Sequence, residues 1–160
     1  MVNGHKETNM AQGIKILAKN KKAWHEYIIE DTYEAGIALK GTEVKSIRLG
    51  KVNFVDSFVL VRDGQCRLYG MHVSPYEQGN IHNSEPTRTR TLLLHKRQIF
   101  KIHDKAAQKG FAIVPLKLYL KNGLVKIEIG IAKGKKLHDK RHADKERDVK
   151  RKIDKALKQY

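Results

Sequence analysis

IVPLKLYLKNGLVKIEIGI, residues 113–131, is the stretch of this sequence that decides the fold. Apolar and polar residues alternate on both sides of Asn122-Gly123, and this dipeptide is the strongest short signal for a two-residue hairpin turn. Pro115 has no backbone N–H to donate, so it predicts a sheet edge or a bulge at its position. The pattern therefore predicts a long antiparallel hairpin near the C-terminal end of the chain.

A second hairpin is predicted upstream of the first. Residues 54–61 and 66–73 are rich in β-branched, aromatic and other apolar residues, and they flank an Asp63-Gly64 turn. Residues 24–31 contain Trp, Tyr and two Ile, which also favours a strand. Cys66 is the single cysteine, and its place in an alternating stretch indicates a small buried hydrophobe rather than a disulfide.

Two helices are expected between the strands. Residues 41–50 offer Thr42 as an N-cap and Gly50 as a terminator. Residues 95–108 place Ile99, Ile102 and Ala106 on one stripe. Many short strands with few helices favour a mainly β fold, a small antiparallel barrel flanked by helices.

Charge points to the class of partner. The formal net charge is +16, and the last 28 residues hold 12 Lys or Arg against 5 Asp or Glu. Each cation that neutralises a phosphate releases condensed counterions, so such a chain binds nucleic acid in a salt-sensitive way. The sequence has no apolar run of about 18 residues, no signal peptide and no lipidation cysteine, so we expect a cytoplasmic protein rather than a membrane partner.

Composition divides the chain into three parts. We expect a leader at 1–13, a folded domain at 14–132 and a basic tail at 133–160. A leader of this kind can be disordered. The tail is too poor in apolar residues to fold alone, yet most of its residues favour a helix. Val149, Ile153, Ala156, Leu157 and Tyr160 share a narrow stripe that can dock on a protein or stack on RNA.

Six blocks of the sequence carry a resemblance to a known family. They are Asn20-Lys-Lys-Ala23, Tyr33-Glu-Ala-Gly-Ile37, Gly41-Thr-Glu-Val-Lys-Ser46, Thr87-Arg-Thr-Arg-Thr-Leu-Leu-Leu94, Val114-Pro-Leu-Lys-Leu-Tyr119 and Gly134-Lys-Lys-Leu-His-Asp-Lys-Arg141. In this order they resemble the small protein B family, the SsrA-binding proteins of bacterial trans-translation. The resemblance covers nearly the whole chain from Ile14 onward.

The resemblance implies an adaptor rather than an enzyme, with no cofactor. Members of the family bind the tRNA-like domain of transfer-messenger RNA (tmRNA, SsrA RNA) through a closed antiparallel barrel of the oligonucleotide-binding type. They carry this RNA to stalled ribosomes. The barrel takes the place of the missing anticodon arm, and the tail, disordered in isolation, becomes helical in the empty messenger channel, near the decoding centre of the 16S ribosomal RNA. Elongation factor Tu and alanyl-tRNA synthetase are further expected partners through the tmRNA complex.

The expected tmRNA-binding residues lie on the folded domain. Glu34 is an acid in a basic chain, which makes chemical sense if it accepts hydrogen bonds from base amines or holds a cation. Cations beside the Leu92–Leu94 run can frame an apolar contact, although strand alternation places Leu93 in the core and Leu92 and Leu94 on the opposite face. The full set is Asn20, Lys21, Lys22, Glu34, Arg88, Arg90, Leu92 and Lys96.

The expected ribosome-binding residues lie in the tail. Gly134 can act as a hinge, the cations can grip phosphates, with a bidentate fork from arginine, and histidine can stack on a base. The full set is Gly134, Lys135, Lys136, His138, Asp139, Lys140 and Arg141.

Two other functions remain open from the residues alone. A general ribosomal RNA-binding or assembly protein would carry the same charge. A nuclease would need clustered carboxylates, and Glu30 and Asp31 point to opposite faces if their strand is regular. His138 and His142 are four residues apart but have no third ligand at a defined spacing, so we expect no metal site.

Overall fold

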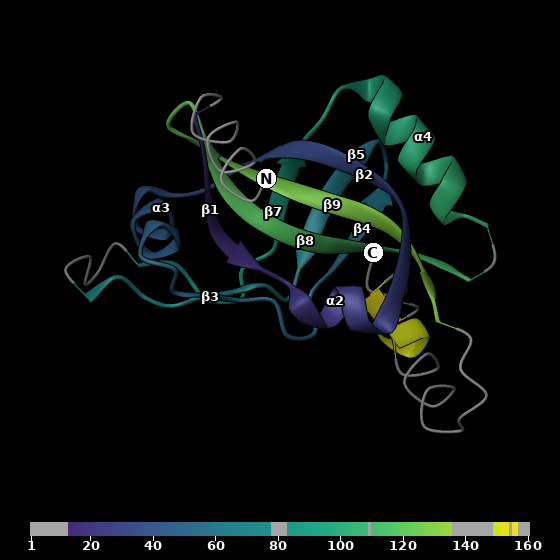
Figure 1. Cartoon of the computed structure of the whole chain (residues 1–160), viewed down its shortest axis with the longest axis horizontal. Helices are drawn as coiled ribbons and strands as arrows, with labels where there is room; N and C mark the ends of the chain where they lie inside the picture. The colour runs from purple at the N-terminus through teal and green to yellow at the C-terminus, as the bar shows by residue number, and fades with distance from the viewer. Residues whose placement is uncertain (1–12, 78–82, 109, 136–148, 154, 157–160) are drawn as a thin grey trace, which may run out of the picture.

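Strands dominate the protein (Figure 1). A computed structural model describes residues 13–77, 83–108, 110–135, 149–153 and 155–156. The strands are β1 (Ile14–Lys19), β2 (Tyr27–Ile37), β3 (Val52–Asn53), β4 (Phe58–Arg62), β5 (Gln65–Tyr69), β6 (His72–Val73), β7 (Arg90–Leu93), β8 (Phe111–Lys121) and β9 (Leu124–Gly134). The helices are α2 (Lys21–Glu26), α3 (Gly41–Arg48) and α4 (Lys96–Ala106).

The strands of the described residues form two antiparallel sheets. The larger has seven strands in the order β1-β8-β4-β5-β7-β2-β9, and β8 pairs with β9 as well. The smaller joins β3 to β6. This arrangement confirms the expected mainly β fold with a few helices.

Both predicted hairpin turns are confirmed. Asn122 and Gly123 have φ values of 51° and 80°, and Asp63 and Gly64 have 53° and 72°. Positive φ at both central residues is the geometry that a two-residue turn needs to match the twist of its strands. The predicted bulge at Pro115 is also present, because the β8–β9 register shifts between Pro115 and Lys117.

The strand predicted at residues 24–31 is wrong in its first half. Lys21–Glu26 form the helix α2, and the strand β2 begins at Tyr27. Asn20 caps this short helix, since its Oδ1 accepts a hydrogen bond from the N–H of Ala23. Ala23 is buried against Val114, Leu116 and Ala132, so contact with the sheet stabilises a helix that local propensity does not predict.

The two predicted helices are present with different ends. Lys40, not Thr42, is the N-cap of α3, and its N–H donates to Oε1 of Glu43 over 2.9 Å. Gly50 follows the helix with a φ of +74°, as a terminator should. α4 buries Ile102 completely and stops at Ala106, within the predicted range.

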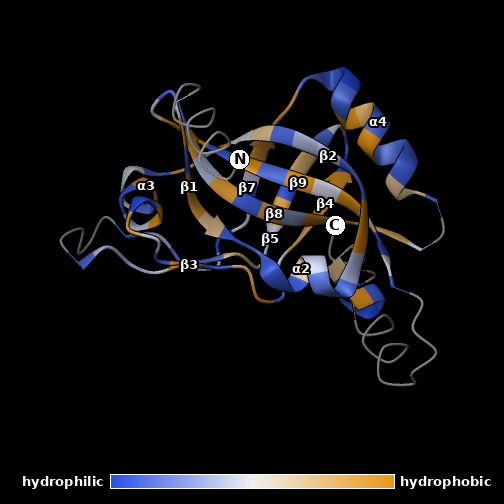
Figure 2. Ribbon diagram, viewed as in Figure 1, coloured by the Kyte–Doolittle hydropathy of each residue, from blue (hydrophilic) through white to orange (hydrophobic). Residues whose placement is uncertain are grey.

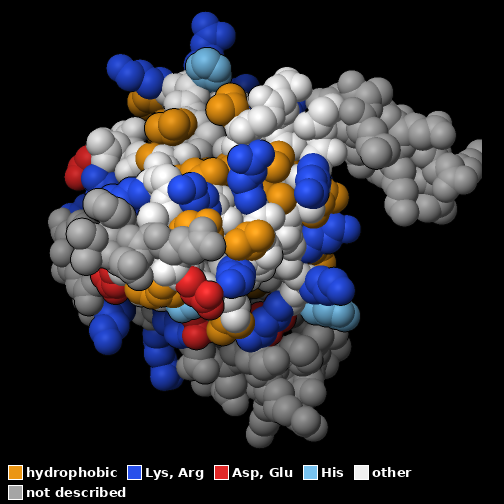
Figure 3. All heavy atoms as spheres, turned by 90° about the vertical axis from the view of Figure 1, so that its left-hand side faces the viewer, with side chains coloured by type: hydrophobic (Ala, Val, Ile, Leu, Met, Phe, Trp, Pro, Cys, Tyr) orange, Lys and Arg blue, Asp and Glu red, His pale blue; other side chains and the backbone are white. Residues whose placement is uncertain are grey.

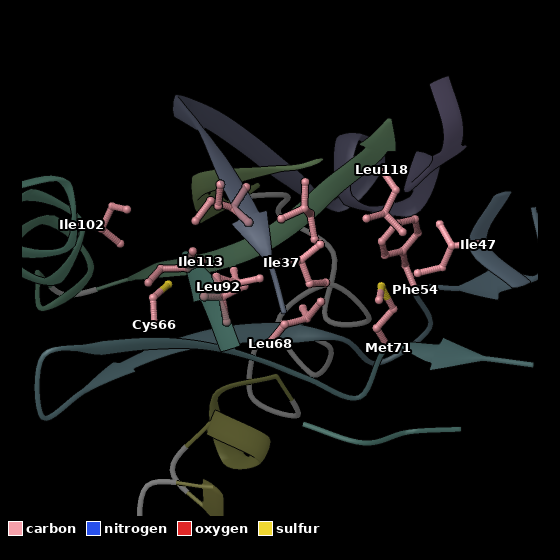
Figure 4. Packing of buried hydrophobic residues seen from close by; sticks show 14 of the residues in the cluster. Ile37, Ile47, Phe54, Cys66, Leu68, Met71, Leu92, Ile102, Ile113 and Leu118 are labelled. Atoms are coloured by element: carbon pink, nitrogen blue, oxygen red, sulfur yellow. The ribbon is translucent and has the colours of Figure 1, made fainter. Parts of the chain in front are cut away.

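The core lies on the inner face of the larger sheet. Apolar residues alternate with polar ones along its strands (Figure 2), and the inward set packs tightly (Figure 4). Ile127, Ile129 and Ile131 of β9 are all fully buried, and Cys66 lies in the same cluster, as expected. A smaller cluster lies under α2.

The start of the basic tail continues the sheet. β9 runs through Gly134, opposite Tyr27, and the N–H of Lys135 donates to the carbonyl of Glu26 over 3.2 Å. Gly134 is therefore the last residue of β9, at the boundary between the sheet and the rest of the tail. Farther on, residues 149–153 are helical. Across the described residues, no helix combines the length and apolarity that crossing a membrane requires.

Candidate RNA interface

Glu34 lies on the outer face of β2 and is held by two groups from β8. The hydroxyl of Tyr119 donates to its Oε2, and Nζ of Lys121 lies 3.3 Å from its Oε1. The Tyr119 hydrogen bond lowers the pKa of Glu34 below its usual value of 4.5, and the charges of Lys121 and Lys126 act in the same direction. Glu34 is thus an ionised, oriented hydrogen-bond acceptor at neutral pH.

The pairing of the strands extends this site into a row. Leu93 pairs with Gly36, Gly36 with Lys126, Lys126 with Tyr119, and Tyr119 with Ile16. Residues paired directly in antiparallel strands point to the same face. The row crosses five strands and is called the outer row here.

Both ends of the outer row are apolar and exposed. The side chain of Leu93 is 58% exposed, and that of Ile16 is 38% exposed. Leu93 lies over Gly36, where an added Cβ would come within 3.1 Å of the Cβ of Leu93. Gly36, two residues after Glu34 on β2, therefore leaves room for the exposed side chain of Leu93 on β7.

Cations surround hydrophobic side chains on the neighbouring surface. Figure 3 shows Lys and Arg interleaved with hydrophobic residues on the side of the molecule that carries β1, α3 and the β8–β9 turn. Near Glu34, the cations Lys121 and Lys126 act on its carboxylate, and Nζ of Lys117 lies 5.6 Å from the centre of the Tyr119 ring. The mixture of cations, apolar side chains and one fixed carboxylate suits RNA, which offers phosphates, base faces and base amines.

The side chain of Asn20 forms hydrogen bonds within the protein. Its Nδ2 donates to the carbonyl of Pro115 over 2.8 Å, and its Oδ1 caps α2. Its backbone N–H also donates to the carbonyl of Leu116 over 2.7 Å. Asn20 therefore fastens α2 to the bulge of β8, and the side chains of Lys21 and Lys22, which follow it, are exposed.

Arg90 is a correction to the predicted RNA site, because it is fully buried. Its Nε donates to Oε2 of Glu43 over 2.7 Å, and its other nitrogens donate to the carbonyls of Met71, Pro86 and Arg88. A guanidinium enclosed in this way fastens α3 to β7 and presents nothing to RNA.

Arg88 shares this network but stays partly accessible. Its side chain is half-buried, and one terminal nitrogen lies 2.5 Å from Oε1 of Glu43. Burial alone raises the pKa of Glu43, but the hydrogen bonds from Arg88 and Lys40 and the charge of Arg90 outweigh it, so the pKa ends below its usual value. Glu43 is therefore a buried anion shared by two arginines.

The leucine assignment is also corrected. Leu92 is 2% exposed and lies in the core, whereas Leu93 points outward. The alternation along β7 is as expected, but its phase is the reverse of the prediction. A run of three leucines carries no signal for the phase, which pairing with β2 and β5 sets.

The remaining predicted residues are Lys96 of the folded domain and the set in the tail. Lys96 is exposed at the start of α4. Gly134 and Lys135 lie at the end of β9 and just after it. Lys136, His138, Asp139, Lys140 and Arg141 lie outside the described residues.

Asp31, one of the two acids considered for a nuclease, forms an ion pair with Lys105 of α4, and Glu34 binds Tyr119 and Lys121. Within the residues that the structure describes, no three His, Cys, Asp or Glu side chains gather as metal ligands would.

Sequence reasoning missed Tyr119, Lys121 and Lys126 as parts of the site. Counting in twos back from the Asn122-Gly123 turn places Tyr119 and Lys121 on one face of β8, which was an available signal. Their approach to Glu34 depends on β9 lying between β8 and β2, and no local pattern specifies that neighbour.

Comparison with known proteins identifies the family of this chain. The family model described as SmpB protein matches residues 17–159. The SsrA-binding protein of Caldicellulosiruptor bescii is 54% identical over 154 residues, covering 96% of this chain and 98% of that protein. The SsrA-binding protein of Carboxydothermus hydrogenoformans is 59% identical over 143 residues, covering 89% of this chain and 96% of that protein.

A solved structure is similar as well. One chain of the structure named "tmRNA-SmpB: a journey to the center of the bacterial ribosome" is 47% identical, with a TM-score of 0.67. The match covers 79% of this chain and 89% of that chain. With its family model, relatives and fold in agreement, this chain belongs to the SmpB family.

Proposed function

We propose that this protein is an RNA-binding adaptor of trans-translation. It binds the tRNA-like domain of tmRNA and takes that RNA to ribosomes that have stalled without a stop codon. The proposal is supported by SsrA-binding relatives of 54% and 59% identity over most of the chain and by the similar SmpB chain of the tmRNA–ribosome structure.

The carboxylate of Glu34 is the observation that carries the proposal. It is ionised, half-exposed and fixed by Tyr119 and Lys121 in a protein whose formal net charge is +16. On a surface that binds RNA phosphates, a fixed acceptor favours bases with exposed amino groups and so adds selectivity to charge. Leu93 then supplies the apolar contact that the sequence assigned to Leu92.

The sheet acts as a closed barrel in this proposal. Strand pairings run from β8 through β4, β5, β7, β2 and β9 and return to β8, which supports closure. A closed barrel holds the outer row at fixed spacing, because no sheet edge is free to open. We assign Lys21, Lys22, Arg88 and Lys96, all of which keep exposed surface, to RNA phosphates.

The tail completes the proposed adaptor. Residues 136–141 carry cations, His138 and Asp139, and we assign this block to the 16S ribosomal RNA around the decoding centre and the empty messenger channel. Elongation factor Tu and alanyl-tRNA synthetase meet the protein through the tmRNA complex in the cytoplasm. The protein itself catalyses no reaction.

Two variants test the division of labour. Glu34→Gln removes the charge at the RNA site with little change in size, and we expect it to lower affinity for the tRNA-like domain by about tenfold, the loss of one charge-assisted contact. Joint replacement of Asp139, Lys140 and Arg141 by alanine should keep that affinity and abolish peptide tagging on stalled ribosomes. Glu85→Gln, at an exposed acid outside the outer row, is the control. Equal loss of RNA affinity in the first two variants would contradict the assignment.

A further inference from the structure

The outer side of α4, turned away from the strands (Figure 1), carries an exposed aromatic residue. Phe100 is 71% exposed, more than any other large hydrophobic side chain among the described residues. The packing of α4 does not use this ring, because Ile102 is fully buried and Ile99 and Ala106 lie against the same core. The apolar stripe of the helix is therefore complete without Phe100, and the ring is available to a partner.

Cations surround Phe100 on the surface of the helix. Residues one, three and four positions away are its neighbours there. The exposed side chains at these positions are Lys96, Arg97, Lys101, His103 and Asp104. Three permanent positive charges and one negative charge therefore lie around one aromatic face. This combination suits an RNA strand with an unpaired base, because bases stack on aromatic rings and cations bind phosphates.

Contacts at both ends of α4 fix the position of Phe100 relative to the sheet. At the start of the helix, the N–H of His95 donates to Oε1 of Gln98 over 3.3 Å. In its last turn, Lys105 forms an ion pair with Asp31 of β2. A helix held in this way loses little conformational freedom when a base stacks on it, and such preorganisation favours binding.

α4 continues directly from the Leu93 end of the outer row. Leu93 is the last residue of β7 and is 58% exposed, and α4 begins at Lys96. Three residues of extended chain span at most about 11 Å, and the four helical residues from Lys96 to Phe100 add about 6 Å. The Cα atoms of Leu93 and Phe100 are therefore at most about 17 Å apart, so one RNA can contact both.

We propose that the outer side of α4 is a second RNA-binding surface, on which Phe100 stacks with an unpaired base of the tRNA-like domain of tmRNA. The neighbouring cations bind the phosphates on either side of that base. The identity of the RNA rests on the proposed function, and the continuity of α4 with Leu93 favours tmRNA over ribosomal RNA. The outer row and α4 then hold one RNA molecule at two places.

Substitutions of Phe100 in the full-length chain separate stacking from simple apolar contact. Phe100→Ala should leave urea unfolding unchanged and lower affinity for the tRNA-like domain by about tenfold, the loss of one base–aromatic contact. Phe100→Tyr should keep the affinity, whereas Phe100→Leu, which has no ring, should lose it as Phe100→Ala does. Val55→Ala, at an apolar residue that is 56% exposed outside α4, is the control and should bind as the wild type does.

The salt dependence of binding distinguishes the ring from the cations around it. Arg97→Gln removes one phosphate contact, so the slope of log affinity against log salt should become shallower by about 0.7 to 0.9. Phe100→Ala should lower affinity equally at every salt concentration and leave the slope unchanged. A wild-type slope for Arg97→Gln, or a wild-type affinity for Phe100→Ala, would overturn the proposal.

A photo-cross-linking side chain identifies the RNA. p-Benzoylphenylalanine replaces Phe100 in the full-length chain, which is illuminated in the presence of tmRNA and ribosomes, and primer extension maps the cross-linked nucleotides. We expect cross-links to unpaired nucleotides of the tRNA-like domain. Cross-links confined to ribosomal RNA would assign this surface to the ribosome and overturn the proposal. Glu34→Gln in the same binding assay reports on the proposed function separately, because a loss with Glu34→Gln but not with Phe100→Ala would refute the α4 surface alone.

Discussion

Glu34 is an anion on a strongly basic surface, and its neighbours explain how it is maintained there. Tyr119 donates a hydrogen bond to one oxygen, and Lys121 lies 3.3 Å from the other. Because the pKa of Glu34 is lowered, its interactions stabilise the fold above the unfolded-state value of about 4.5, and this stabilisation is lost as the pH falls through the lower folded-state pKa. Around neutral pH the Glu34 carboxylate therefore stays ionised and remains a hydrogen-bond acceptor.

Tyr119→Phe should raise the pKa of Glu34 toward 4.5, because the hydroxyl is the largest cause of its depression. Carbon-detected NMR titration of the Glu34 carboxyl measures this directly. A Glu34 pKa that stays where it was would show that Tyr119 does not hold the carboxylate.

Leu92 and Leu93 provide a matched pair of adjacent residues with opposite roles. Leu92→Ala empties a fully packed site, so it should lower the free energy of unfolding by about 2–5 kcal/mol. Leu93→Ala should change stability by less than about 0.5 kcal/mol yet weaken binding of the tRNA-like domain. Urea unfolding and a binding titration on both variants measure the two effects. A stability loss confined to Leu93→Ala would reverse the assignment.

At the scale of elements, a buried charge network fastens α3 to β7. Glu43 accepts hydrogen bonds from Arg88 and Arg90, and Arg90 has no exposed surface. Removing one partner of a buried pair leaves an uncompensated charge, so Glu43→Gln should lower the free energy of unfolding by about 3–5 kcal/mol.

The effect of Glu43→Gln should depend on pH in a defined direction. The depressed pKa means that the wild-type advantage is complete above about 4.5 and shrinks as the pH falls through the folded-state value. Urea unfolding at pH 7 and at pH 3 checks this. Glu85→Gln, at an exposed acid, should change stability little at either pH. An equal difference between wild type and Glu43→Gln at both pH values would contradict a role for the ionised carboxylate.

The hairpins could be predicted from sequence, whereas α2 could not. Asn122-Gly123 and Asp63-Gly64 act locally, since their positive φ values are a property of the turn itself. α2 is six residues long and depends on Asn20 reaching the carbonyl of Pro115, which is 95 residues away. The β-rich composition of residues 24–31 describes the strand that follows and hides the helix turn before it.

Exposure of the candidate RNA-binding residues could be predicted only in part. The family blocks suggested Glu34, Lys21 and Lys22 as RNA ligands, and the structure places all three at the surface. Arg90 was misassigned because an arginine in a basic motif resembles a phosphate ligand until its buried partner, Glu43, is known. The partners of Glu34 come from strands that pair over more than 80 residues of sequence.

At the scale of the whole molecule, charge is distributed over both the folded domain and the tail. Residues 133–160 hold 12 basic and 5 acidic side chains, a difference of +7, which leaves +9 of the total +16 for the rest of the chain. Charge alone therefore predicts tight binding of any RNA by either part. Selectivity has to come from geometry, and the outer row with Glu34 at its side is the geometry proposed for it.

The most direct test compares RNA selectivity with and without the tail. Affinity for the tRNA-like domain and for an unrelated hairpin of equal length is measured over a salt series, with the full chain and with residues 1–135, which end just after β9. We expect the shortened chain to lose affinity for both RNAs and a shallower salt dependence, but to keep its preference for the tRNA-like domain at moderate salt. A shortened chain that binds both RNAs equally would contradict the central claim that the folded domain reads tmRNA.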